Sequence, residues 1–163
     1  MRLIDRLARR SARLPFPLFI GIIISIGIVL RFAQFEANRS LWLDEASLAL
    51  NVLQRSILQL TYPLDYHQAA PLGFLVVQKQ LVELLGGTEY ALRAYPFFCG
   101  VLSLFLFYKL ASFYIPSKSI LVALGLFAVL EPLIYYSSEA KQYSSDVFVA
   151  LVLSLLLARL AWQ

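Results

Sequence analysis

The sequence predicts an all-α, polytopic membrane protein with about four transmembrane helices and two interfacial helices in its first external loop. The chain is 60% hydrophobic, with a mean hydropathy of +0.73. A globule of 163 residues cannot bury that much apolar surface. The apolar residues also come in long runs, as membrane spans do. The basic residues form no single extended patch, so we expect no nucleic-acid partner.

The N-terminal segment predicts the orientation of the chain. Residues 1–13 contain five arginines and one acid, Asp5, directly before an apolar run. The positive-inside rule therefore indicates a cytoplasmic tail. Residues 14–35 form the first predicted span, and Arg31 near its far end is expected to snorkel to the interface. The apolar run is too long for a signal peptide and lacks a small-x-small exit, which indicates a retained anchor.

Residues 36–90 are predicted to form one external loop that carries two helices. The 45–60 segment is amphipathic, with Leu53 and Ile57 on its apolar face, and it is too polar to span a bilayer. The 71–85 segment begins with a proline suited to a helix start. As a helix it would reach roughly 22 Å, which is short of the ~30 Å hydrocarbon core. Both helices are therefore expected to lie in the membrane interface.

The remaining apolar runs predict three more spans, at residues 91–115, 119–136 and 147–162. The charges agree with this arrangement. The 36–90 loop carries six acids and three bases, whereas the turn before the third span carries Lys118 and no acid. This bias indicates an integral, multi-pass protein with a cytoplasmic N-terminus. In a bacterium the membrane would be the plasma (inner) membrane.

Three polar clusters fall on the external side of this topology. A site that joins a hydroxyl to a phosphate-activated sugar needs a base for the acceptor proton. It also needs cations that offset charge on the departing phosphate. Asp44 is the candidate base, and Arg93 and Lys141 are the candidate phosphate binders. The full set of candidate site residues is Asp44, Glu45, His67, Gln68, Arg93, Glu139, Lys141 and Tyr143.

Each of these residues also has a structural interpretation. Asp44 could be a helix N-cap, with Glu45 complementing the dipole of the helix that follows. His67 is the chain's single histidine and is more readily a solvated loop residue, since the ligand count disfavours zinc. Lys141 could be an interfacial lysine that snorkels. Tyr143 could belong to an aromatic belt at the membrane surface.

Four motifs follow one another along the chain: LWLDEA at 41–46, HQAAPLGF at 67–74, GTEYALRAYP at 87–96 and SEAKQYSSD at 138–146. Taken in order, they resemble those of GT-C glycosyltransferases of the protein O-mannosyltransferase and aminoarabinose transferase type (glycosyltransferase family 39). Each is weak alone, but four in the family's order are fairly specific. The second departs from the family's His-x-Pro-Pro-Leu element, because Ala69 and Ala70 precede Pro71.

The resemblance implies a membrane enzyme with its site on the non-cytoplasmic face and a polyprenyl-phosphate sugar donor. By this resemblance Asp44 would be the catalytic acid/base, Glu45 its acidic neighbour, and Arg93 and Lys141 contacts to the donor phosphate or braces of the site. The acceptor would be a glycan, a lipid or a protein. The one cofactor left open is a divalent cation, and no metal ligands are assigned.

The length of the chain also enters these expectations. Family members usually carry many more spans, so residues 1–163 are expected to be the N-terminal part of a GT-C transmembrane domain that does not transfer sugar alone. Two other classes stay open. One is a small transporter or channel subunit, with Arg93, Lys109 and Glu131 along a path. The other is a non-catalytic membrane assembly protein.

Overall fold

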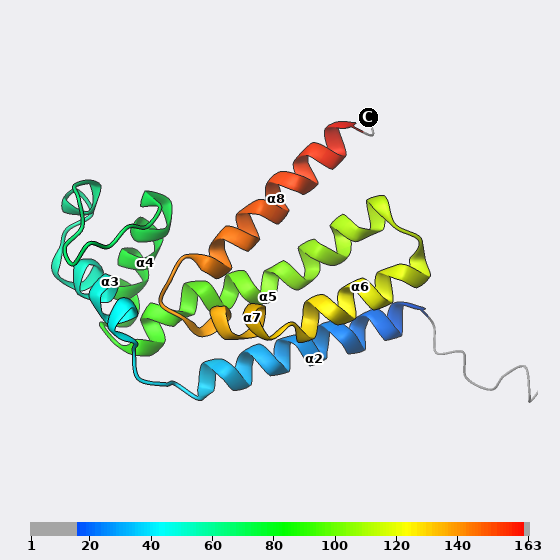
Figure 1. Cartoon of the computed structure of the whole chain (residues 1–163), viewed down its shortest axis with the longest axis horizontal. Helices are drawn as coiled ribbons and strands as arrows, with labels where there is room; N and C mark the ends of the chain where they lie inside the picture. Colours follow the sequence, from blue (N-terminus) through cyan, green and yellow to red (C-terminus); the bar gives the residue numbers. More distant parts are fainter. Residues whose placement is uncertain (1–15, 162–163) are drawn as a thin grey trace, which may run out of the picture.

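The computed structural model describes residues 16–161, and this part of the chain is helical without any strand (Figure 1). The predicted all-α class is therefore confirmed. The expected cytoplasmic tail, residues 1–13, lies outside the described residues. The helices are α2 (Phe16–Glu36), α3 (Leu43–Gln54), η1 (Gln59–Thr61), α4 (Leu72–Leu85), α5 (Glu89–Tyr114), α6 (Ser117–Val129), α7 (Glu131–Tyr135), η2 (Tyr136–Ser138) and α8 (Tyr143–Ala161).

Three helices are long and apolar enough to cross a membrane: α2, α5 and α8. A fourth candidate exists if α6 and the α7–η2 segment count as one span, since they meet at a bend of 55°. The expectation of about four spans thus agrees with the structure only when the bent pair is counted as one. α4, with 14 residues, is not among the candidates.

The span predicted over 119–136 is bent, because the helix breaks at Leu130, whose backbone is extended. The reason is Pro132. Proline has no N–H to donate to the carbonyl four residues earlier, and in a continuous helix its ring would clash with that carbonyl. The carbonyl left without its helical donor is that of Ala128. It accepts a hydrogen bond of 3.0 Å from Nη1 of Arg31 on α2 instead.

The long helices form a bundle around α5, which packs against α2, α6 and α8. Small residues allow the close approaches. A Cβ added to Gly100 on α5 would lie 2.6 Å from the Cβ of Ser137, and one added to Gly27 on α2 would lie 3.0 Å from Leu104. Figure 1 shows that α8 starts beside the first part of α5 and diverges from it toward the C-terminus, whereas α6 and α2 stay side by side.

At one end of the bundle, α3 and α4 form a small cap over the start of α5 (Figure 1). The cap has its own apolar core, in which Leu48 and Val52 of α3 pack with Phe74 and Leu75 of α4 and with Leu92 of α5. This core explains why two short amphipathic helices are stable, because each buries its apolar face against the other.

The helix predicted over 45–60 is shorter than expected, because α3 ends at Gln54 and Arg55 is extended. The reason is a set of polar contacts that close the following loop. Arg55 donates to the carbonyl of Pro63 at 2.9 Å and pairs with Asp65 at 2.8 Å. Asn51 binds the backbone of Asp65 through both its amide nitrogen and its carbonyl oxygen. These contacts compensate for the lost helical turn.

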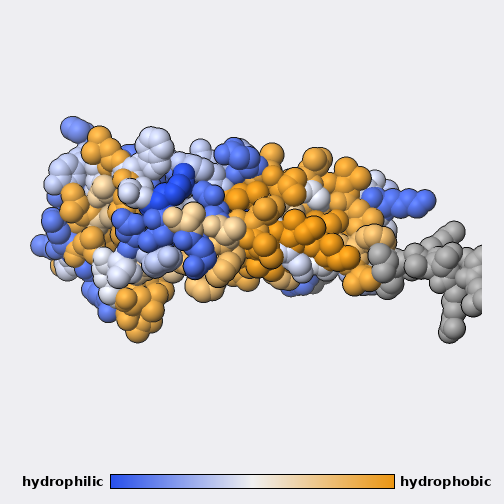
Figure 2. All heavy atoms as spheres, turned by 90° about the horizontal axis from the view of Figure 1, so that it is seen from below, coloured by the Kyte–Doolittle hydropathy of each residue, from blue (hydrophilic) through white to orange (hydrophobic). Residues whose placement is uncertain are grey.

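The ends of the candidate spans meet beside this cap. The end of α2, the start of α5, the end of η2 and the start of α8 all lie there, whereas the α5–α6 turn lies at the other end (Figure 1). The visible face in Figure 2 is hydrophilic near the cap and hydrophobic along much of the bundle. The 36–90 loop and the 139–142 segment therefore lie at the same end of the bundle.

Candidate active site

An open cleft of about 310 Å³ lies where the start of α3 meets the η2–α8 connection. It joins segments about a hundred residues apart in the chain. Its walls are aromatic and its polar groups are carboxylates and one lysine, which gives it both stacking surfaces and charge. The lining residues are Trp42, Asp44, Glu45, Tyr135, Tyr136, Glu139, Lys141 and Tyr143.

A ring of three polar side chains joins two residues of the cleft, Asp44 and Lys141, to Gln68, which lies outside the lining. The Asp44 carboxylate lies 2.8 Å from Nζ of Lys141 and accepts a hydrogen bond of 3.0 Å from Nε2 of Gln68. Nζ of Lys141 also donates to Oε1 of Gln68 at 2.7 Å. Each member comes from a different segment, so the ring forms only when the three segments converge. The expected proximity of Asp44 to Lys141 is present.

Exposure differs sharply between the two charged partners. The Asp44 side chain is 63% exposed, whereas that of Lys141 is 6% exposed. The carboxylate therefore presents its face to the cleft, while the ammonium group is held beneath it. Lys141 is not the snorkelling lysine of the structural interpretation. Because it is nearly buried, its conformational freedom is small and its charge is well positioned.

The contacts of Asp44 also determine its protonation. Hydrogen bonds from Lys141 and then from Gln68 lower the pKa of the Asp44 carboxyl from its ordinary value, against a weaker opposing effect of burial. The group is therefore ionised at neutral pH, which is the state that a proton acceptor needs, and the lowered pKa also makes the carboxylate a weaker base. Asp44 is also not the N-cap of α3, since that position is taken by Trp42.

The role of Glu45 is structural and differs from that of Asp44. It is 2% exposed, and its Oε1 accepts a hydrogen bond of 2.8 Å from the backbone N–H of Ala140. Its Oε2 accepts from the backbone N–H of Trp42 at 3.1 Å, at the start of α3. One carboxylate thus ties the first turn of α3 to the residue before Lys141. Glu45 acts as a brace that sets the distance between Asp44 and Lys141.

Arg93 lies behind this brace and does not line the cleft. Its guanidinium is 2% exposed and lies 3.9 Å from Oε1 of Glu45 and 3.8 Å from Glu89. It also donates to the side-chain carbonyl of Asn38 at 3.0 Å. Of the two roles that the sequence left open for Arg93, these contacts favour bracing, since the side chain reaches the site only through Glu45.

A further cation, Arg39, lies against Tyr135 in the wall of the cleft and is not among the residues predicted for the site. The Arg39 guanidinium lies 4.3 Å from the centre of the Tyr135 ring, in a cation–π arrangement. Burial raises the pKa of the neighbouring Glu139 carboxyl, and Glu45 adds to that rise, whereas Tyr135, Arg39 and Lys141 oppose it. The cleft therefore holds two carboxylates whose pKa values move in opposite directions.

His67 is the candidate that the structure keeps away from the cleft. Its backbone φ is +55°, the residue is exposed, and it is not among the lining residues. Its neighbour Gln68 completes the ring instead. In the part of the chain that the structure describes, no group of three or more His, Cys, Asp or Glu side chains could hold a metal ion. The divalent cation left open by the sequence therefore has no assembled ligand set in residues 16–161.

Comparison with known proteins adds no relative. No family model, curated protein or solved structure matches the chain.

Proposed function

We propose that this chain forms the donor-side part of a membrane glycosyltransferase, which moves a sugar from a polyprenyl phosphate to an acceptor hydroxyl. The proposal rests on the resemblance to GT-C enzymes and on the cleft. The observation that carries it is the contact between Asp44 and Lys141. An ionised carboxylate and a buried ammonium group, held side by side under an aromatic rim, are the two groups that the reaction needs.

The roles follow from the positions. The exposed Asp44 carboxylate accepts the proton of the acceptor hydroxyl, and the acceptor oxygen forms a bond to the anomeric carbon of the sugar. The bond from that carbon to the phosphate oxygen breaks, and the polyprenyl phosphate leaves with the electron pair. Lys141 offsets the charge that develops on the phosphate. Trp42, Tyr136 and Tyr143 supply faces on which a sugar ring can stack.

The position of the cleft suits a lipid-linked donor. It lies beside the ends of the candidate spans, so a donor with its chain in the bilayer and its phosphate at the surface could reach Lys141. In this proposal the protein is an integral, multi-pass protein with a cytoplasmic N-terminus, and the cleft faces the other side of the membrane. The acceptor can be a glycan, a lipid or a protein.

The test edits the encoding gene in its own host and measures sugar transfer in isolated membranes from a panel of labelled polyprenyl-phosphate sugars. Asp44→Asn should reduce transfer by at least about a hundredfold, the range of a lost general base. Asp65→Asn is the matched control, since Asp65 is 64% exposed and also forms a 2.8 Å ion pair. Transfer that survives Asp44→Asn, or falls equally in both variants, would contradict the proposal.

The transporter alternative makes the opposite prediction. Lys109 and Glu131 are exposed, while Arg93 is buried under the cap. If transport were the activity, sugar transfer in these membranes would not depend on this chain. Asp44→Asn would then leave both sugar transfer and the flux of ions or solutes unchanged.

A further inference from the structure

Arg31 is a buried charge on α2 that faces the break between α6 and α7. The expectation that Arg31 snorkels to the interface is wrong, because the residue is 1% exposed. Its Nη1 donates to the carbonyl of Ala128, which Pro132 leaves without a helical donor, and to the carbonyl of Gly27, each at 3.0 Å. These bonds hold the side chain in the interior of the bundle.

Those two carbonyls neutralise Arg31 only in part. None of the ion pairs found within residues 16–161 involves Arg31. Its Nε is fully buried and has no hydrogen-bond partner in the described part of the chain. A guanidinium removed from water without a counter-charge is costly, and carbonyl dipoles at a helix end supply only part of a unit charge. The site therefore lacks one negative charge and one acceptor.

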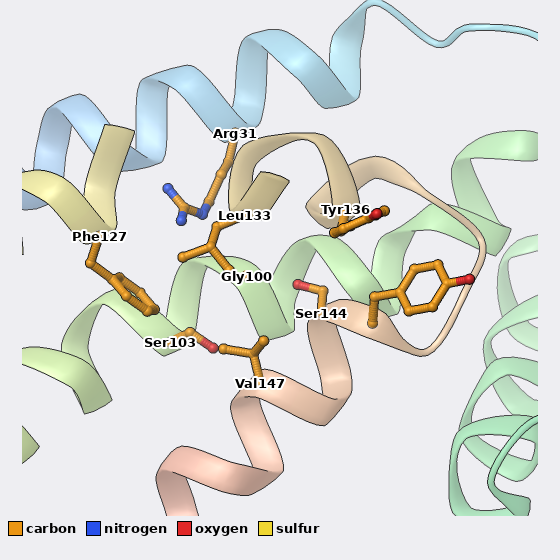
Figure 3. Close-up of a pocket in the computed structure, with 9 residues that line it drawn as sticks. Arg31, Gly100, Ser103, Phe127, Leu133, Tyr136, Ser144 and Val147 are labelled. Carbon is orange, nitrogen blue, oxygen red and sulfur yellow. The ribbon is translucent and has the colours of Figure 1, made fainter. Parts of the chain in front are cut away.

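A small cavity adjoins this group. It lies between α2, α5, α7 and α8, is lined by Arg31 and by the hydroxyl-bearing residues Ser103, Ser144 and Tyr136, and has a volume of about 20 Å³. Figure 3 shows the Arg31 side chain extending from α2 toward Leu133, with Ser103 and Ser144 on the opposite side. A cavity of this size holds one small species, since a water needs about 10–15 Å³ by the same measure.

We propose that this cavity binds one halide-sized monovalent anion, chloride in the cell, against the Arg31 guanidinium. Charge selects an anion over water, because only an anion supplies the missing negative charge. Volume selects a single small ion over phosphate, which is too large for the space. The Ser103 hydroxyl already donates to the carbonyl of Cys99 at 2.7 Å, whereas the hydroxyls of Ser144 and Tyr136 are donors that can turn toward an anion. This site is separate from the Asp44–Lys141 cleft, although Tyr136 and Tyr143 line both.

The direct test uses the whole wild-type chain. Crystals grown with bromide as the only halide should give an anomalous difference peak beside the Arg31 guanidinium. A cavity that is empty or holds only water under those conditions would overturn the proposal. This measurement needs no variant, so it does not depend on whether a substituted bundle folds.

A second test measures binding in solution. In detergent micelles, the wild-type chain should broaden the ³⁵Cl NMR line, and Arg31→Met should abolish that broadening. Lys79→Met is the matched control, because Lys79 is also buried but has a carboxylate partner, Glu83, at 3.7 Å. This variant should retain the broadening. Equal broadening in the wild-type and Arg31→Met chains would contradict an anion at Arg31.

Discussion

Replacing Glu45 with alanine should destabilise the whole cap, because this one carboxylate joins three parts of the molecule. It accepts backbone hydrogen bonds from Trp42 at 3.1 Å and from Ala140 at 2.8 Å, and it faces the buried Arg93 guanidinium at 3.9 Å. The substitution leaves the Ala140 N–H without its acceptor and Arg93 with only the more exposed Glu89 as an ion-pair partner.

The magnitude follows from burial. A hydrogen bond to a charged group contributes about 1.5–3 kcal/mol, and Glu45 accepts two of them. Removing one partner of a buried ion pair costs about 3–5 kcal/mol, much of it from the charge that stays behind. These effects overlap, so we expect Glu45→Ala to lower the free energy of unfolding by about 3–5 kcal/mol. Glu45→Gln keeps a carbonyl acceptor and should cost less.

The assay is reversible unfolding in mixed detergent micelles, followed by circular dichroism. Glu83→Ala is the control, because Glu83 is 58% exposed and its ion pair with Lys79 measures 3.7 Å along one helix. Ion pairs four residues apart on one helix contribute about 0.3–0.5 kcal/mol, and the buried Lys79 keeps the carbonyl of Leu53 as an acceptor at 3.3 Å. If Glu45→Ala changed the free energy of unfolding no more than Glu83→Ala does, the bracing role assigned to Glu45 would be refuted.

Three further predictions concern protonation, packing and topology. The pKa of Asp44 is lowered in the folded chain, so the ionised carboxylate stabilises the fold above the pKa of the unfolded carboxyl, and this stabilisation is lost as pH falls through the lower folded value. Carboxyl ¹³C NMR should show Asp44 titrating below the ordinary pKa of an aspartate. Titration at or above the ordinary pKa would contradict the prediction. Gly100→Ala should destabilise by about 1–3 kcal/mol through overpacking, whereas Gly125→Ala, with open space around it, should not. In a cysteine-free background, a cysteine at Asp44 should react with an impermeant external reagent and one at Lys118 should not; external labelling at 118 would overturn the topology.

Much of the fold could be predicted from the sequence because membrane helices leave strong local signals. Long apolar runs locate α2, α5 and α8, and the proline before α4 marks its start. The failures have local causes as well. The bend at Leu130 is not predicted from hydropathy, because hydropathy is averaged over a window and is insensitive to the single backbone N–H that Pro132 lacks. The early end of α3 depends on the hydrogen bonds of Asn51 with the backbone of Asp65. The helical periodicity of the apolar residues does not predict this contact.

The members of the candidate site could be predicted only in part, since His67 and Arg93 do not line the cleft, whereas Trp42, Tyr135 and Tyr136 do and were not candidates. Asp44, Gln68 and Lys141 were selected from motif order, and the structure brings them together. The division of labour between Asp44 and Glu45 was not predictable, because adjacent helical residues point in different directions and only the fold shows which one meets Ala140. The prediction that Arg31 snorkels to the membrane interface is wrong for a similar reason. Position along an apolar run does not reveal whether a side chain faces lipid or a neighbouring helix.

The central claim is that the cleft holds a lipid-linked sugar, and photocrosslinking tests it most directly. A photoreactive phenylalanine analogue replaces Tyr143 in the cleft or, as a control, the exposed Tyr62 on the cap. A labelled polyprenyl-phosphate sugar in native membranes should crosslink at position 143 and not at 62, and Lys141→Met should abolish the signal. Equal crosslinking at both positions, or crosslinking at 143 that does not depend on Lys141, would contradict the account.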